Sequence, residues 1–523
     1  MVRDARHKRG NERVHARLRR AMDARKRAYG SLLSNEADLS TTLLPEFSPK
    51  VARGQGEFMR AVVEGFRFRA FAVAAVCLIG SAHDFARPAW AQVQRSGEPS
   101  EVPQPNMTGD WGGLRSYLER NGITFTINYT NDFLANVSGG IGRGAVGIGI
   151  FQPQLDIDTK KFVGWEGGHF HTHALLTHGP LFSPAYLGNI LAASNLEAGA
   201  VARLYSFWYE QNAFAGRVSV RAGLLSADSL FLQSKTASNF INNAISWPTF
   251  LAANLPAGGP AYPLPAPGVR VRVKPIDEIA LQVGVFSGDP SGGNGSNQPA
   301  PLPSGTVVSF RGGAFMIAEL SYLPNQGKDA KGLPGAYRIG AWYNTSPRFA
   351  DQRFDSTGRS LADPASTGIP LNHTGDTGFY GVVDQMLYRV PGSEDRGLSG
   401  FVRAGAVPND RNLINFYADA GIVYKGLIPR RPDDKVGIAA AHARVGENAR
   451  GLDADTALFG NFFYPVRSGE TMVELIYQTQ LAPWWMLQPE VQYIIRPGGG
   501  VLNNDGSLRP NAWVLAIRSA LSF

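Results

Sequence analysis

The sequence predicts an all-β protein, a transmembrane antiparallel β-barrel of about 16 strands with long extracellular loops and a short N-terminal segment. Three observations predict this class. Apolar and polar residues alternate with a period of two along most of the chain, polar turn segments separate the alternating runs, and the polar faces carry charged side chains. In a membrane barrel the apolar face contacts lipid and the polar face surrounds water, so the polar face accepts charges that a packed core excludes.

The alternation is clear in residues 123–130. Isoleucine, phenylalanine and tyrosine occupy the odd positions, and threonine and asparagine occupy the even positions. Successive side chains of a strand point to opposite faces, so this segment is interpreted as a strand with one apolar face. The same pattern predicts strands near residues 123–130, 151–158, 168–176, 200–211, 217–225, 269–274, 279–286, 313–323, 336–344, 378–388, 399–407, 413–425, 435–443, 470–481, 487–496 and 512–523.

The net charge of +8 comes from one end of the chain. Residues 1–91 carry 17 basic and 9 acidic side chains, and the remaining residues carry 34 of each sign. Proteins that bind nucleic acid concentrate positive charge in the domain that binds. The balanced body of this chain therefore indicates that nucleic acid is not a partner.

Cysteine usage and hydropathy exclude further classes. The single cysteine, Cys77, lies in an apolar run that we expect to be removed. Disulfide frameworks, zinc–thiolate sites, iron–sulfur clusters and cysteine nucleophiles are therefore excluded from the mature chain. The chain also lacks the roughly 18 consecutive apolar residues of a membrane-spanning helix.

Residues 59–91 have the order of a secretory signal peptide. Three arginines follow Met59, residues 70–80 form an apolar run, and Ala89 and Ala91 place small side chains at positions −3 and −1 of a cleavage site. We expect cleavage after Ala91. The rest of the chain is then exported.

The segments on either side of the signal peptide differ in composition. Residues 1–58 are rich in arginine and poor in aromatic residues, so we interpret them as a disordered basic leader or as a mis-assigned start, with Met59 as the true first residue. Residues 92–122 are expected to form an N-terminal segment with a short helix. Residues 123–523 form the predicted barrel domain.

A soluble β-sandwich or solenoid is the rival fold, because it also hides an apolar strand face. The barrel is favoured by the signal peptide and by aromatic residues near the predicted strand ends, where the interfacial girdles of barrels lie. The last strand is amphipathic and ends in Phe523, a form that the barrel-assembly machinery reads. We therefore predict a bacterial outer-membrane location, with outer-membrane lipid and this machinery as partners.

Three connecting segments, 226–268, 287–311 and 345–377, are too long for hairpin turns and are rich in Gly, Pro, Ser and Asn. The first contains five aromatic residues that need cover, so we expect it to fold into the barrel and narrow it. The glycine-rich run 139–149 lacks the strand-to-helix context of a phosphate-binding loop and is interpreted as a flexible connector.

Several sequence blocks resemble the carbohydrate-selective outer-membrane porins of the OprB family. The resemblance covers essentially all of residues 108–523, and the blocks occur in the family's order. No counterpart in the family matches residues 1–58, and the long loops differ among members. The matching blocks are 108–115 (TGDWGGLR), 286–290 (FSGDP), 340–343 (GAWY), 416–426 (FYADAGIVYKG), 430–434 (RRPDD), 488–494 (QPEVQYI) and 497–499 (PGG).

The resemblance implies a barrel of sixteen strands that passes monosaccharides, such as glucose, and small polyols down their gradients. It implies no covalent chemistry and no cofactor, so an enzyme is not expected. The related general porins are trimers, and single barrels are also feasible, so both a homotrimer and a monomer stay open.

Side chains on the predicted inward faces are the candidates for the pore lining. A selective sugar pore needs charged and amide groups to replace the water around hydroxyls, and aromatic faces for C–H surfaces. Alternation nominates seven residues, namely Arg270, Arg272, Glu319, Arg338, Trp342, Arg403 and Asp419.

Three alternate histidines, His169, His171 and His173, share one face of a predicted strand. Alternate histidines can share a metal ion, but an inward strand of a water-filled barrel can also carry them without a ligand. Only Glu166 is near in sequence as an acidic partner. We therefore predict no metal site and keep the three residues as weak candidates.

Two other functions stay open at this stage. The barrel could be a general or structural pore without sugar preference. An outer-membrane hydrolase is the other alternative, and the mature chain has no Gly-x-Ser-x-Gly motif that would support it.

Overall fold

The protein is described by a computed structural model. All described residues belong to one compact unit of the chain, Pro88–Phe523. The expected leader, the expected signal peptide and the N-terminal segment up to residue 105 lie outside the described residues. These are 106–291, 304–306, 308–327, 330 and 332–523.

Sixteen antiparallel strands form a closed barrel, and β1 pairs with β18 to close it. Each other strand pairs with its neighbours in sequence, except that β9 pairs with β12. The predicted fold class is confirmed. The strands are β1 (Ile123–Ser138), β2 (Gly144–Asp158), β3 (Gly168–His178), β4 (Val201–Ala213), β5 (Val218–Leu225), β6 (Ala266–Ile276), β7 (Ile279–Ser287), β8 (Ala314–Tyr322), β9 (Gly335–Asn344), β12 (Asp376–Arg389), β13 (Gly397–Ala406), β14 (Ile414–Lys425), β15 (Lys435–Val445), β16 (Gly469–Ala482), β17 (Trp485–Ile495) and β18 (Ala512–Ser522).

The remaining elements are short and lie in the connections. Among the described residues, none of the helices has the length and apolar character needed to cross a membrane. They are η1 (Trp111–Gly113), α3 (Leu114–Arg120), α4 (Thr159–Val163), η2 (Ser183–Leu187), η3 (Ala227–Ser229), η4 (Ala237–Asn239), α5 (Asn243–Ser246), α6 (Thr249–Ala252), η5 (Pro256–Gly258), α7 (Glu447–Gly460) and η6 (Pro497–Gly499), together with a small sheet of β10 (Phe349–Asp355) and β11 (Pro370–His373).

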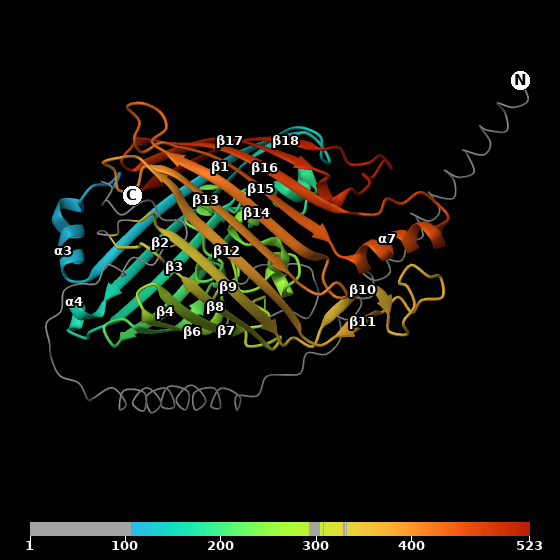
Figure 1. The fold of residues 1–523 in the computed structure, drawn as a ribbon, viewed down its shortest axis with the longest axis horizontal. Helices are drawn as coiled ribbons and strands as arrows, with labels where there is room; N and C mark the ends of the chain where they lie inside the picture. The colour runs from blue at the N-terminus through green and yellow to red at the C-terminus, as the bar shows by residue number, and fades with distance from the viewer. Residues whose placement is uncertain (1–105, 292–303, 307, 328–329, 331) are drawn as a thin grey trace, which may run out of the picture. The chain divides into compact units, whose positions relative to one another are not determined.

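The two ends of the barrel differ. At one end α3 and α4 lie near the C-terminus, and at the other end α7, β10 and β11 extend beyond the strands (Figure 1). Turns such as residues 277–278 join strands at the first end, whereas the longer connections lie at the second. In outer-membrane barrels the short turns are periplasmic and the long loops extracellular.

The strands place apolar side chains outside and polar side chains inside. On β6, Val269, Val271 and Val273 are 45%, 39% and 37% exposed, whereas the alternate residues Arg270 and Arg272 are 2% and 8% exposed. This is the orientation that the alternation predicts. The outer surface therefore presents hydrocarbon, as contact with acyl chains requires.

The barrel closes between β1 and β18, and side chains join these two strands as well as the β ladder. Arg518 on β18 donates two hydrogen bonds of 2.7 Å to the Asp132 carboxylate on β1. The backbone N–H of Phe523 donates to the carbonyl of Ile127 at 2.9 Å. Arg115, on α3, donates to the carbonyl of Phe523 at 2.8 Å. The short N-terminal helix is thus attached to the C-terminal strand.

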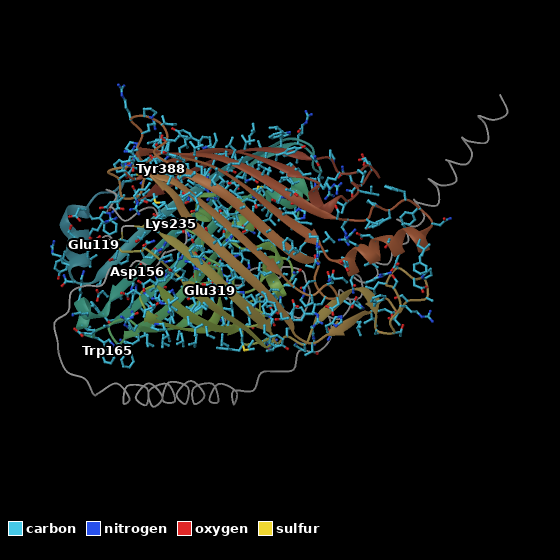
Figure 2. The ribbon with its side chains drawn as sticks, viewed as in Figure 1. Glu119, Asp156, Trp165, Lys235, Glu319 and Tyr388 are labelled. Carbon is cyan, nitrogen blue, oxygen red and sulfur yellow. The ribbon has the colours of Figure 1, made fainter. Side chains whose placement is uncertain are left out.

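The loop of residues 226–265 folds into the barrel, where its green turns lie between the strands in Figure 1. Phe231, Phe240, Trp247 and Phe250 are all buried. Figure 2 shows Lys235 of this loop and Glu319 of β8 within the outline of the strands. The expectation that segment 226–268 folds inward is confirmed. Burial of its aromatic side chains supplies the driving force.

Carboxylates on the barrel wall hold this loop by its backbone. Asp384 on β12 accepts hydrogen bonds from Ser234 Oγ at 2.5 Å and from the N–H and Oγ1 of Thr236, both at 2.8 Å. Glu474 on β16 accepts from the N–H groups of Ile241 and Asn242 at 2.8 and 3.2 Å. Irregular backbone inside a barrel has few partners of its own, so wall side chains satisfy it.

A second loop, residues 179–200, is held in the same way. Glu470 on β16 accepts hydrogen bonds from the N–H groups of Ile190 and Leu191 at 2.7 and 2.8 Å. Ser194 Oγ donates to Asp132 Oδ2 at 2.6 Å. The sequence did not single out this loop, because it is shorter and has fewer aromatic residues than the first.

The expectation for the glycine-rich run 139–149 is wrong in part. Only residues 139–143 form the turn, and β2 begins at Gly144. A Cβ added at Gly147 would lie 3.3 Å from the Phe133 ring on β1. Glycine here leaves room for an aromatic neighbour on the adjacent strand, so it does not mark the end of a strand.

An outward charge on β6 tests the orientation of the strands. We expect Val271→Arg to destabilise the protein folded in lipid bilayers, lowering its free energy of unfolding by about 2–4 kcal/mol, because the guanidinium would face acyl chains. Urea titrations of protein folded into liposomes measure this free energy. The control, Val271→Leu, should change it by less than about 1 kcal/mol. Equal stability of the arginine variant would contradict the outward assignment.

Removal of a loop anchor tests how the inward loop is held. Asp384→Ala leaves the Thr236 N–H without its acceptor, at a cost of about 1–3 kcal/mol. We expect amide hydrogen exchange in residues 226–265 to become about tenfold faster. Mass spectrometry of the detergent-solubilised protein measures this rate. Asp505→Ala, in the exposed loop between β17 and β18, is the control and should leave the rate unchanged.

Candidate functional site

The interior of the barrel is asymmetric, because the two inward loops bond mainly to one side of it. Their hydrogen-bond partners lie on β1, on β7 and β8, and on β12 to β18. Two side chains on β2 to β6 also bond to the loops: the Tyr205 hydroxyl donates to Ser226 Oγ at 2.8 Å, and Thr177 Oγ1 donates to the Gly199 carbonyl at 2.6 Å. We call the inward side chains on these five strands the β2–β6 wall. They are Asp156, His169, His171, His173, Arg203, Trp208, Glu210, Ser219, Arg221, Arg270 and Arg272.

Trp208 lies at the centre of the β2–β6 wall. The Arg221 guanidinium lies 3.7 Å from the centroid of the indole, and the His171 ring stacks on it at 4.8 Å with an interplanar angle of 20°. The His169 ring is tilted against the indole at 5.4 Å. Stacking on both sides holds the indole in one orientation.

Glu210 organises the cations around it. Its carboxylate accepts hydrogen bonds from Arg221 Nε at 2.5 Å, from Ser219 Oγ at 2.6 Å and from Arg270 Nη2 at 3.4 Å. Arg270 Nη1 also donates to Ser219 Oγ at 2.7 Å. One carboxylate therefore serves two guanidinium groups, and this cluster carries a surplus of positive charge.

Two further arginines of the wall have no anionic partner among the residues that the structure describes. Arg203 on β4 is 5% exposed, and Arg272 on β6 is 8% exposed. The Nε and Nη1 atoms of Arg203 and the Nε atom of Arg272 are buried without a hydrogen-bond acceptor in this part of the chain. Buried donors normally have a partner, so these N–H groups require one from outside the described residues.

The three histidines lie together on β3, and their acidic partner is Asp156 on β2. Asp156 Oδ1 lies 2.8 Å from His169 Nε2 and 2.9 Å from His171 Nδ1. Glu166, the partner considered from the sequence, pairs with Lys160 at 2.7 Å instead. Within the described ranges, no group of three or more His, Cys, Asp or Glu side chains has an arrangement that would hold a metal ion.

Two of the seven nominated residues bond to the inward loop, and a third pairs with one of them. Glu319 Oε2 accepts a hydrogen bond from the Leu232 N–H at 2.9 Å. Arg403 donates to the carbonyls of Leu232, at 3.3 Å, and Ile245, and it pairs with Asp419. Because their polar atoms are engaged by loop and wall, we interpret Glu319, Arg403 and Asp419 as loop anchors.

The other four nominated residues lie in three places. Arg270 and Arg272 lie on the β2–β6 wall. Arg338 on β9 lies 3.8 Å from Glu319, next to the loop anchors. Trp342 is 2% exposed and packs against Phe315, with ring centroids 5.8 Å apart, so it belongs to the packed interior.

The sequence missed the residues at the centre of the wall, Trp208 and Glu210. The cause is a register shift between β3 and β4, where His173 pairs with Ser206 but Ala174 pairs with Leu204. An extra residue of this kind turns the following side chains to the opposite face. A count by twos from Arg203 therefore places Trp208 on the lipid side. The unusual density of aromatic and charged residues in 203–210 was the one available signal.

Two carboxyl groups of the inward loops are buried. Burial raises the pKa of Glu197, although it accepts hydrogen bonds from the N–H and Oγ of Ser183 at 2.8 and 2.6 Å. Burial also raises the pKa of Asp228, which accepts a hydrogen bond from the Tyr262 N–H at 2.9 Å. Both groups act within their loops, so neither supplies a free charge to the β2–β6 wall.

Comparison with known proteins places this geometry in a family. Residues 143–523 match the family model described as carbohydrate-selective porin, OprB family. Porin B of Pseudomonas aeruginosa is 28% identical over 429 residues, which cover 76% of this chain and 89% of that protein. A putative porin, QuiX, of Acinetobacter baylyi is 24% identical over 446 residues, which cover 80% of this chain and 93% of that protein.

Solved structures agree with the sequence comparison. The structure of Pseudomonas putida OprB at high pH superposes with a TM-score of 0.70 at 25% identity, covering 82% of this chain and all of that one. The family match spans most of the chain. It includes fifteen of the sixteen barrel strands, and therefore all strands of the β2–β6 wall. The chain therefore belongs to the carbohydrate-selective porins of the OprB family, which are outer-membrane β-barrel channels.

Proposed function

We propose that this porin passes monosaccharides, such as glucose, and small polyols down their concentration gradients along the β2–β6 wall. The observation that carries the proposal is the asymmetry of the interior. The inward loops are fastened mainly to the other strands, and N–H groups of Arg203 and Arg272 on the β2–β6 wall have no acceptor among the described residues. Family membership supports carbohydrate as the solute class.

The chemistry of the wall suits a hydroxylated solute. A sugar that enters a narrow passage loses water from its hydroxyl groups, and donors and acceptors of the wall must replace that water. Arg221 and Arg270 donate hydrogen bonds, and Glu210 and Asp156 accept them. The sugar contacts these groups one after another and binds each of them weakly. It can therefore also leave the passage, as transport requires. The proposed process makes and breaks no covalent bond.

Two alternatives lead to different measurements. A general or structural barrel would show no preference for sugars over other solutes of the same size. An outer-membrane hydrolase would consume ester or glycoside substrates, whereas a passive porin leaves them intact. Both are tested with the same purified protein.

The first test is permeation through the reconstituted protein. We expect proteoliposomes to swell about tenfold faster in glucose than in sucrose, because the two inward loops narrow the passage. Arg221→Ala should lower this ratio at least about threefold, since it removes both the guanidinium and the support of the Trp208 ring. Arg217→Ala, in the exposed turn between β4 and β5, is the control. Equal rates of permeation for glucose and for amino acids of the same size would contradict the proposed preference for carbohydrate.

The second test concerns assembly in the outer membrane. We propose that the barrel-assembly machinery recognises β18 and the terminal Phe523. The contacts of Phe523 with Ile127 and Arg115 support a role for this end in closing the barrel. Deletion of Phe523 should lower the amount of folded, heat-modifiable protein in outer membranes about tenfold. Deletion of the exposed residue Gly506, in the loop between β17 and β18, serves as the control. Normal assembly without Phe523 would contradict the proposal.

A further inference from the structure

We infer that the β2–β6 wall is a binding track for anionic sugars, that is, small polyhydroxy acids such as aldonates, in preference to neutral ones. This inference rests on the proposed function and names a narrower class of solute for the same passage. It concerns four arginines on three adjacent strands, namely Arg203 on β4, Arg221 on β5, and Arg270 and Arg272 on β6.

These arginines lie at different heights between the two ends of the barrel. Arg221 pairs in register with Arg270 on one side and with Glu210 on the other. Arg272 lies two residues farther toward the end with short turns. Arg203 lies near the start of β4, at the end with long loops. Positive side chains therefore occur at several levels between the two ends.

The β2–β6 wall carries more arginines than carboxylates that pair with them. Glu210 is the carboxylate that pairs with Arg221 and Arg270. Asp156 is engaged by His169 and His171. In the described part of the chain, Arg203 and Arg272 form no ion pair, and the Glu210 carboxylate acts on Arg272 only at longer range. A guanidinium that is more than nine-tenths buried loses much of its hydration, so an anion that reaches it is favoured.

Several carboxylates elsewhere inside the barrel are bonded to the inward loops or to arginines. Asp384, Glu470 and Glu474 accept hydrogen bonds from the backbone of the inward loops. Asp132 and Asp419 are each paired with an arginine of their own, Arg518 and Arg403. These acids are therefore engaged by the loops or by their own cations. Arg203 and Arg272, which form no ion pair among the described residues, both lie on the β2–β6 wall.

The chemistry of this wall fits a carboxylate that also carries hydroxyl groups. A guanidinium binds a carboxylate through two parallel hydrogen bonds, so the acid group can pass from one arginine to the next. Glu210 and the histidines, which are engaged with neighbouring side chains of the wall, place further hydrogen-bonding atoms beside these arginines. The balanced charge of the body of the chain conceals this arrangement, because selectivity follows the charges along the passage more than the total.

The test uses the full-length mature porin in two assays. In planar bilayers under a tenfold KCl gradient, we expect a zero-current potential that corresponds to a permeability ratio of chloride over potassium above about 3. In proteoliposomes, labelled gluconate should enter at least about twofold faster than labelled glucose. A chloride preference without a gluconate preference would overturn the inference, because it would reduce the track to a binder of small inorganic anions.

The variant Arg203→Gln/Arg272→Gln removes the two unpaired charges and keeps side chains of similar length. We expect it to lower both ratios at least about threefold. The control is Arg217→Gln, which removes one positive charge from an exposed turn where Arg217 lies 3.8 Å from Asp277, and it should leave both ratios unchanged. Heat-modifiable migration in gels checks that each variant is folded. Each single variant replaces the double variant if the latter does not fold.

The outcomes separate this inference from the proposed function. Glucose entry with no preference for gluconate, or with a preference for potassium, would overturn the anionic track and leave the carbohydrate porin in place. Failure of both glucose and gluconate to enter would overturn both. A gluconate preference that the double variant keeps would also contradict the inference, since it would assign the selectivity to other residues.

Discussion

The structure depends on one constraint, which is that irregular backbone inside a membrane barrel must find hydrogen-bond partners on the wall. The two inward loops have little regular structure, and their N–H groups bond to carboxylates on β12 and β16. Without these acids the loops would carry unsatisfied donors at membrane depth, which costs several kcal/mol for each group. The acids of the wall are therefore structural groups first.

This constraint also shapes the passage. The hydrogen bonds of the loops lie mainly on one side of the barrel and engage charged side chains there. In the proposed function the solute passes along the other side, the β2–β6 wall. One set of hydrogen bonds would then determine both the course of the passage and the side chains that a solute reaches.

Charged residues on an inward strand face consequently have two different roles that look alike in the sequence. Glu319 and Arg270 both follow the same alternation, yet Glu319 accepts a hydrogen bond from the backbone of the loop and Arg270 bonds to Ser219 and Glu210 of its own wall. The difference arises from contacts between distant parts of the chain. Glu474 and Ile241, for example, are 233 positions apart. No local pattern contains this information.

The sequence by itself determined which side chains face lipid, except on β4 beyond the register shift, and it located all sixteen barrel strands to within a few residues, except at the glycine-rich start of β2 and the long end of β1. It could do so because lipid accepts only apolar groups, and a strand exposes every second residue to it. Only the tertiary structure decided which inward side chains are free. That choice depends on where the loops dock and on one register shift that turns Trp208 and Glu210 inward. Both are properties of neighbouring strands and distant loops, and period-two alternation does not record them.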